Sequence, residues 1–125
     1  MRKLPHYLTA AQVEQLLAAS VEVNERLLIL LCWRGGLRVT EALGVEGRDL
    51  EFGEHPTVRI RAEHAKNSRE RIVPLHPELA LALKYAVEYA GKRSLVGMNR
   101  TTAWRRVKRC AERAGLDTTD LGVPP

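Results

Sequence analysis

Aromatic side chains are scarce in this chain, which holds one Phe, two Trp and three Tyr among its 125 residues. Because hydrophobic residues still make up 45% of the sequence, its core must be built mainly from Leu, Val, Ile and Ala. No apolar run approaches the roughly 20 residues that a membrane-spanning helix needs, and the opening residues are too few and too polar for a signal peptide. We therefore expect a soluble, cytoplasmic protein with no membrane partner.

Cysteine is scarce as well. The two cysteines, Cys32 and Cys110, both fall within expected helices, and no Cys-x-x-Cys motif occurs. His6, His55 and His64 are scattered along the chain and form no set of metal ligands. We therefore expect two reduced thiols, no metal site and no cofactor.

Positive charge is concentrated in one segment. The chain carries a formal net charge of +5, and residues 100–113 contain six Arg or Lys and a single acid, Glu112. This segment accounts for the whole net charge, since the remaining residues sum to zero. Such a segment favours a polyanionic partner such as nucleic acid, although a merely solvated helix face has the same composition.

The spacing of apolar residues predicts a mainly helical chain. After a basic lead-in at 1–8, interpreted as the stub of a linker, a capping box from Thr9 to Gln12 opens a helix that reaches about Ser20. Residues 24–34 are apolar nearly all round, so this helix is expected to be central and buried. Further helices are expected at 40–43 with Thr40 as cap, at 77–90 after His76, and from Thr101 or Thr102 to Ala114.

Between residues 49 and 75 the pattern changes to the alternation of β-strands. Three short strands are expected at 49–52, 58–61 and 72–75, forming one antiparallel sheet. Pro74 has no N–H for the sheet, so its strand should lie at an edge. The polar residues 63–70 predict an exposed hairpin loop. The expected fold class is therefore α+β, mainly α: a helical domain with a small three-stranded antiparallel sheet.

Two adjacent glycines, Gly35 and Gly36, end the apolar helix, and Arg38 follows just before the next helix. Glycine ends helices readily because it adopts the left-handed conformation without a Cβ clash. A tight junction between packed helices fixes the direction of a long side chain, and a fixed guanidinium suits two-pronged recognition of a phosphate. The alternative is an arginine that extends into solvent from a helix end or pairs with Glu41.

Two segments of the sequence resemble motifs of one enzyme family. The segment G-L-R-V-T-E-A-L around Arg38 resembles the first active-site box of tyrosine recombinases, the phage-integrase family. The segment K-N-S-R-E-R-I-V-P-L, which begins 28 positions later at Lys66, is similar to the hairpin that carries the catalytic lysine of that family. The opening L-P-H-Y-L-T also resembles the start of the family's catalytic domain. The resemblance implies that residues 9–125 form about the first two-thirds of such a domain.

The resemblance implies a site-specific recombinase that breaks and rejoins DNA through a phosphotyrosine intermediate. Arg38 would hold the charged phosphate, Lys66 would protonate the departing 5′ oxygen, and Glu41 would brace the helix junction. The family's His-x-x-Arg box and its later nucleophilic tyrosine do not occur in these residues. We therefore expect this chain to be a fragment that is inactive alone. Tyr85 and Tyr89 are interpreted as packing residues and not as nucleophiles.

Double-stranded DNA is the expected partner, and self-association is expected because recombinases of this family act as tetramers on DNA. The residues expected to contact DNA are Asn99, Arg100, Thr101, Arg105, Arg106 and Arg109. Two alternatives remain open. The chain could be a non-enzymatic DNA-binding module, with the helices ending at Ala90 and Ala114 acting as a helix-turn-helix, or a remnant of structural value only.

Overall fold

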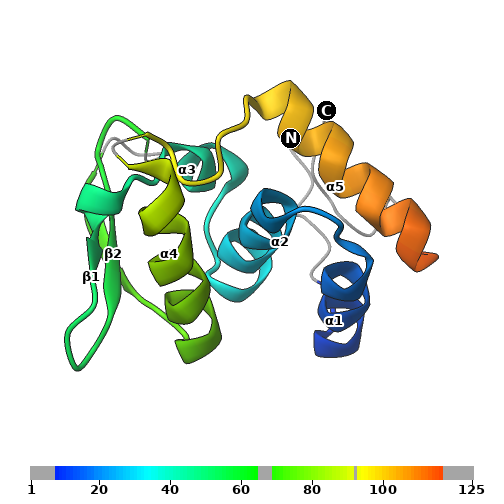
Figure 1. Ribbon diagram of the computed structural model, residues 1–125, viewed down its shortest axis with the longest axis horizontal. Helices are drawn as coiled ribbons and strands as arrows, with labels where there is room; N and C mark the ends of the chain where they lie inside the picture. Colours follow the sequence, from blue (N-terminus) through cyan, green and yellow to red (C-terminus); the bar gives the residue numbers. More distant parts are fainter. Residues whose placement is uncertain (1–7, 65–68, 92, 117–125) are drawn as a thin grey trace.

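The chain forms a mainly helical domain with a three-stranded antiparallel sheet at one end, which confirms the expected fold class (Figure 1). The computed structural model describes residues 8–64, 69–91 and 93–116. Its helices are α1 (Ala10–Ala19), α2 (Val23–Ile29), a π-helical turn (Leu30–Arg34), α3 (Val39–Gly44), a 3-10 turn (Gly47–Asp49), α4 (Pro77–Ala90) and α5 (Arg100–Ala114). Its strands are β1 (Leu50–Glu51), β2 (Thr57–Ile60) and β3 (Arg71–Pro74).

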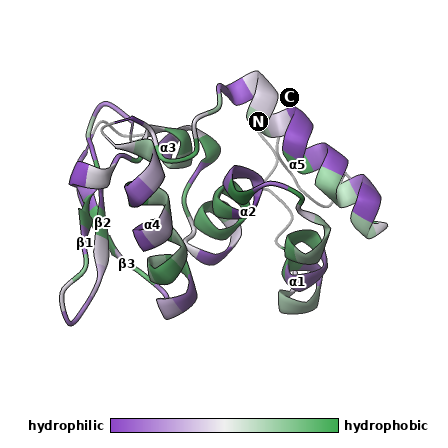
Figure 2. Cartoon of the chain, in the orientation of Figure 1, coloured by the Kyte–Doolittle hydropathy of each residue, from purple (hydrophilic) through white to green (hydrophobic). Residues whose placement is uncertain are grey.

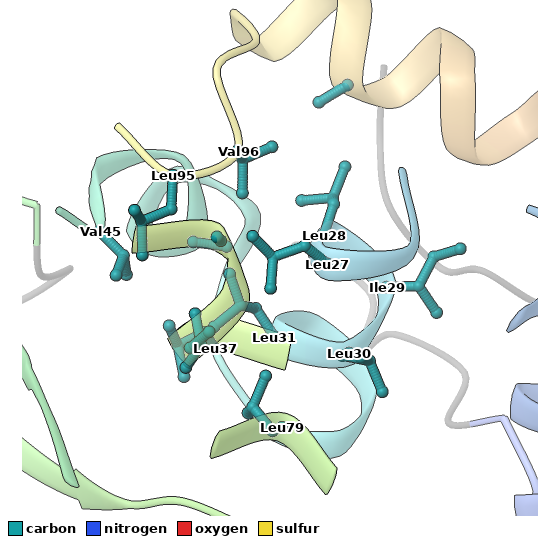
Figure 3. Packing of buried hydrophobic residues seen from close by; sticks show 14 of the residues in the cluster. Leu27, Leu28, Ile29, Leu30, Leu31, Leu37, Val45, Leu79, Leu95 and Val96 are labelled. Atoms are coloured by element: carbon teal, nitrogen blue, oxygen red, sulfur yellow. The ribbon is translucent and has the colours of Figure 1, made fainter. Parts of the chain in front are cut away.

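The core is centred on α2 and the π-helical turn that continues it. Leu28 and Leu31 have no measurable exposure, and the three other apolar residues between 27 and 31 are also buried. Figure 3 shows these side chains surrounded by Leu37, Leu79 and Val96, which come from three other parts of the chain. The prediction of a central helix over residues 24–34 is therefore confirmed, except that its last turn is π-helical.

The sheet has the order β1-β2-β3, and both neighbouring pairs are antiparallel. Val58 and Ile60 of the central strand are buried, because alternate side chains of a strand point to the same face. Pro74 lies at the end of the outer strand β3, opposite Thr57, so its position at an edge is confirmed. The sheet is small because its strands have only two to four residues each.

Capping interactions define the helix starts, and two of the expected caps are wrong. The capping box between Thr9 and Gln12 is confirmed. His76 caps α4, since its Nδ1 accepts a hydrogen bond from the Glu78 N–H at 3.1 Å. Helix α5 is capped by Asn99 and not by either threonine, and α3 is not capped by Thr40, which lies inside the helix.

Helix α5 is strongly amphipathic. Its buried residues are Ala103, Val107, Cys110 and Ala111, while most of its basic residues are exposed. Figure 2 shows hydrophilic stretches interrupted by more hydrophobic ones along this helix. Gly115, with φ of 75°, ends the helix, and the Leu116 N–H bonds to the Ala111 carbonyl at 2.9 Å. Trp104 is partly buried and packs against the core.

Helices α4 and α5 are not arranged as a helix-turn-helix pair. Helix α4 packs against α2 and the π-helical turn, whereas α5 packs against α1, α2 and α3. Figure 1 shows α2 between them. This arrangement gives no support to the alternative in which these two helices read DNA together.

The two tyrosines of α4 do not pack in the core. Tyr85 is 61% exposed and Tyr89 is 83% exposed, so the interpretation of both as packing residues is wrong. With Leu81, which is 61% exposed, they form an apolar stripe along the outer face of α4. The buried face of this helix is already completed by smaller apolar residues such as Leu79, Leu83 and Ala86.

Both cysteines are free thiols, as expected. Burial raises the pKa of Cys32 to about 12 and that of Cys110 to about 11. Neither thiol therefore forms a reactive thiolate near neutral pH.

Within the described parts of the chain, no helix combines the length and the apolar character that crossing a membrane requires.

Candidate active site

The junction before Arg38 depends on two glycines with different roles. The π-helical turn ends at Gly35, whose N–H bonds to the Leu30 carbonyl at 2.8 Å. A Cβ at Gly35 would lie 2.7 Å from the Leu31 carbonyl oxygen and 3.0 Å from Leu79 Cδ2, so no larger residue fits there. Gly36 meets no such obstacle, but its φ of 73° is one that other residues rarely adopt. Together they turn the chain sharply at the end of the central helix.

Arg38 lies at the N-cap of α3 with an extended backbone and an exposed side chain. Its N–H donates to Glu41 Oε1 at 3.0 Å, so the glutamate three positions later replaces the expected threonine cap. The backbone of Arg38 is fixed by this bond, while its guanidinium remains accessible to solvent. Glu41 thus contacts the backbone of Arg38, and its predicted role beside a catalytic arginine stays a prediction.

Glu41 is only 2% exposed and is held by Arg71 from strand β3. Arg71 donates from Nη1 to Oε2 at 2.6 Å and from Nη2 to Oε1 at 2.9 Å, a two-pronged pair. Burial by itself raises the pKa of Glu41, but the bonds from Arg71 and the Arg38 N–H outweigh it and leave that pKa below its usual value. The same hydrogen bonds raise the pKa of Arg71. The pair is therefore ionised near neutral pH.

A second set of contacts fixes the start of the β2–β3 hairpin against the end of α3. Arg61, buried after β2, donates from Nη2 to the Gly44 carbonyl at 2.7 Å and also pairs with Glu46 at 3.2 Å. The imidazole of His64 lies against Gly44 so closely that a Cβ there would come within 2.6 Å of it. Together with the Arg71–Glu41 pair at the start of β3, these contacts attach both ends of the β2–β3 hairpin to α3. Lys66 lies outside the described residues, so its predicted role stays a prediction.

The segment before α5 is attached to the same region. Ser94 Oγ donates to the Leu43 carbonyl at 2.6 Å, and the Leu95 N–H donates to the Val45 carbonyl at 2.9 Å. Helix α3 also packs against α5. The helix that carries Arg38 and the basic helix are thus held next to each other by direct contacts.

The residues expected to contact DNA lie in three environments: exposed on α5, at the cap of that helix, and, for Arg106, in ion pairs with α2. Arg100, Thr101, Arg105 and Arg109 are exposed on α5. Asn99 is exposed as well, but its amide oxygen caps the helix by accepting the Thr102 N–H at 2.8 Å.

Arg106 belongs to a different environment. Its Nη1 lies 3.0 Å from Glu22 Oε2 and 3.1 Å from Glu25 Oε2, so its guanidinium connects α5 to the start of α2. Arg113 adds to this connection through the Ala19 carbonyl at 3.0 Å. Arg106 is therefore held by ion pairs with acids of the same chain, unlike Arg105 and Arg109.

Glu25, at the centre of this connection, is only 5% exposed. Burial raises its pKa, but the N–H groups of Val21 and Glu22 and the guanidinium of Arg106 outweigh that effect, so the pKa is lowered overall. The acidic group thus stays charged and holds two basic residues of α5 on the core side. The exposed basic residues of α5 are consequently the ones left for an external partner.

Two structural residues escaped the sequence reasoning, Arg71 and Arg61. Arg61 follows a strand where basic residues alternate with apolar ones, a pattern that normally means a solvent-facing side, and Arg71 opens an otherwise apolar strand. Nothing in either pattern identifies the group that the arginine contacts, since Glu41 lies 30 positions from Arg71 and the Gly44 carbonyl lies 17 positions from Arg61. Only the position of Glu41 three residues after Arg38, in capping-box spacing, was a local indication.

Comparison with known proteins agrees with this geometry. Residues 6–122 match the model of the phage integrase family. The chain is 28% identical to tyrosine recombinase XerD of Proteus mirabilis over 96% of this chain and 43% of the relative. It is 32% identical to tyrosine recombinase XerA of Saccharolobus solfataricus over 93% of this chain and 39% of the relative. The chain therefore spans less than half the length of these curated relatives.

Solved structures with the same fold come from the same kind of protein. A crystal structure of XerA recombinase superposes with a TM-score of 0.75 at 19% identity, over 95% of this chain and 45% of that one. A structure of XerH site-specific recombinase bound to its difH substrate superposes with a TM-score of 0.70 at 23% identity, over 96% of this chain and 41% of that one. At these identities the likeness concerns the fold. The match over nearly all of the sequence, together with the fold, shows that this chain belongs to the phage integrase family.

Proposed function

We propose that this chain forms the phosphate-binding part of a tyrosine-recombinase active site and binds double-stranded DNA beside it. The observation that carries the proposal is the exposed guanidinium of Arg38, on a backbone held by the buried Glu41. An arginine fork of fixed direction suits the non-bridging oxygens of a phosphate, where negative charge builds up in the transition state. Glu41 and Arg71 neutralise each other, so Arg38 keeps its charge for an external anion.

In the complete reaction, Arg38 would stabilise the five-coordinate phosphate while a tyrosine attacks it. Lys66 would give its proton to the departing 5′ oxygen, because an alkoxide leaves poorly unless it is protonated. Both roles come from the resemblance of the two motifs. The family to which the chain belongs supports them, and the relatives' names describe recombinases.

The DNA backbone would extend from Arg38 along the exposed face of α5. Arg100, Thr101, Arg105 and Arg109 are all exposed on this helix, and α3 packs against it. Contacts of this kind position a protein on DNA without reading its sequence. Binding by this chain should therefore be weak, sensitive to salt and largely independent of sequence.

The test is a titration of a short duplex with the chain at several salt concentrations. Arg38→Ala should weaken binding about tenfold at about 0.1 M salt, because one phosphate contact changes the salt slope by about 0.9. The matched control is Arg48→Ala, which removes one positive charge from an exposed site on the 3-10 turn. Equal effects of the two substitutions would favour the non-enzymatic DNA-binding module, in which α5 alone supplies the affinity.

We also propose that copies of the chain associate on DNA. The exposed apolar stripe of α4, Leu81, Tyr85 and Tyr89, supports this, since soluble proteins seldom leave such a row uncovered. Light scattering after size-exclusion chromatography would measure the association with and without a duplex. A chain that remains monomeric in both conditions at high concentration would argue against it.

A further inference from the structure

Arg71 is the residue whose role the proposed function leaves unassigned. It is the first residue of β3, and its side chain crosses to α3 to bind Glu41 with both nitrogens. It is not a plain surface charge, because the acid it binds is 2% exposed. Among the described residues, no hydrogen bond joins Arg71 to Arg38 directly, and both bond to Glu41. The structure therefore connects Arg71 to Arg38 through Glu41.

Glu41 Oε1 connects two donors. The same oxygen accepts the Arg38 N–H at 3.0 Å and the Arg71 Nη2 at 2.9 Å. The other oxygen, Oε2, accepts a hydrogen bond from Arg71 Nη1 at 2.6 Å and none from Arg38. A carboxylate held by a fork has one rotamer, so the cap that it forms on Arg38 has one geometry. Without the fork, the buried carboxylate would lose its counter-charge and turn toward water or take up a proton.

We propose that Arg71 is a positioning residue for the phosphate site: through Glu41 it fixes the backbone of Arg38 and thereby the direction in which the Arg38 side chain leaves the start of α3. This rests on the proposed function of Arg38, and it adds a residue that the motif resemblance did not assign. Arg71 also follows Lys66 by five positions in the same hairpin. One ion pair thus joins the strand after the hairpin loop to the helix that carries the phosphate clamp.

A matched control exists on the neighbouring strand. Arg59 of β2 has a side chain 39% exposed and pairs with Asp49, whose side chain is 1% exposed, at 3.5 Å. Arg71 has a side chain 43% exposed and pairs with Glu41, whose side chain is 2% exposed. Both arginines lie in the same sheet and pair with a buried acid, but only Glu41 caps Arg38. Asp49 also pairs with Arg61 at 3.1 Å, so it keeps a counter-charge when Arg59 is replaced. Arg59→Met therefore reproduces the loss of a charge and of an ion pair in the sheet without touching the cap.

The first measurement needs no DNA. Nuclear magnetic resonance of the 125-residue chain would follow the carboxyl carbon of Glu41 against pH and the hydrogen exchange of the Arg38 amide. In Arg71→Met, the pKa of Glu41 should rise above its usual range and the Arg38 amide should exchange at least tenfold faster. In Arg71→Lys, which keeps the charge but not the fork, both values should fall between those of the parent chain and those of Arg71→Met. If Arg71→Met leaves both values unchanged, as Arg59→Met should, the proposal is overturned.

The second measurement is a double-mutant cycle on DNA affinity. Arg71→Met should weaken binding of the duplex nearly as much as Arg38→Ala, and the two together should cost little more than either alone. If the effects of Arg38→Ala and Arg71→Met simply multiply, Arg71 does not act through Arg38 and the proposal is overturned. If Arg38→Ala has no effect while the Arg38 amide still responds to Arg71→Met, the phosphate function fails and the positioning of the cap stands. Circular dichroism of each variant checks that it is folded.

Discussion

Glycine 35 shows how one small residue shapes the site. Its position is closed on one side by the Leu31 carbonyl and on the other by the side chain of Leu79. The backbone can leave the central helix there only because no Cβ is present. Gly36 then supplies the positive φ that points the chain toward Arg38. Steric space and backbone freedom are thus provided by two different glycines.

Replacing Gly35 by Ala should therefore lower the free energy of unfolding by about 1–3 kcal/mol, the usual cost of overpacking a core. The nearest atom is a carbonyl oxygen of the backbone, which cannot move away as a flexible side chain could. Urea denaturation followed by circular dichroism would measure the change. Gly53→Ala is the control, because a Cβ there meets nothing within 4 Å and φ is not positive. Equal effects at the two positions would contradict this account of the junction.

The pKa shifts of Glu41 and Glu25 predict how the stability of the chain changes at low pH. Both have a pKa lowered from 4.5 in the folded chain, so both bind protons more readily when the chain is unfolded. Their contribution to stability is therefore complete above about pH 4.5 and is lost as the pH falls through the lower folded values. In thermal melting experiments between pH 7 and pH 3, the melting temperature should decrease once the pH is below about 4.5.

The variant Glu41→Gln should be less stable at neutral pH and should lose less stability on acidification, because one titrating group is gone. Glu88→Gln, on the exposed face of α4, removes the same charge and is the matched control. An acid transition of Glu41→Gln with the same steepness as that of the parent would contradict the role of this carboxylate.

At the scale of elements, α5 has two charged sides with different roles. On one side Arg106 and Arg113 bind Glu25 and Ala19 and fasten the helix to α1 and α2. On the other side Arg105 and Arg109 point to solvent. Arg106 was among the residues expected to contact DNA, but the acids at the start of α2 bind it.

Neutralising Arg105 and Arg109 together, as Arg105→Gln and Arg109→Gln, should lower the slope of log affinity against log salt by about 1.8, the value for two phosphate contacts. Arg106→Gln should change this slope less and should reduce the melting temperature, because it leaves the buried Glu25 with a weaker counter-charge. Anisotropy titrations at four salt concentrations and thermal melting would separate the two effects. If all three substitutions alter the slope equally, α5 binds DNA with both sides.

For the whole molecule, the chain carries two candidate catalytic groups but no aligned nucleophile among its described residues. The stripe residues Tyr85 and Tyr89 lie on the exposed face of α4, which packs against α2 and the π-helical turn. Groups that act together in catalysis lose nearly all of their effect when one of them is missing.

The 125-residue chain should therefore form no covalent adduct with a nicked duplex, as judged on denaturing gels. The variants Tyr85→Phe and Tyr89→Phe serve as controls for any adduct that does appear. An adduct that disappears in either variant would show that an exposed tyrosine of α4 is the nucleophile. It would also overturn the expectation that this chain is inactive alone.

The sequence by itself determined the fold class, the central helix, the edge position of Pro74 and the family. These follow from local rules: apolar periodicity sets helix or strand, proline lacks an N–H, and the two motifs are contiguous runs of residues. It also located the glycine pair and the capping residue His76, because each depends only on residues a few positions away.

Only the tertiary structure decided which charges are free and which are bound. The Arg71–Glu41 pair joins residues 30 positions apart, and the Arg106–Glu25 pair joins residues 81 positions apart. A basic residue on an exposed strand or helix looks the same in sequence whether its partner is a buried acid or water. The choice between them depends on which elements pack together, because an ion pair forms only where the chain brings the two groups within a few ångströms.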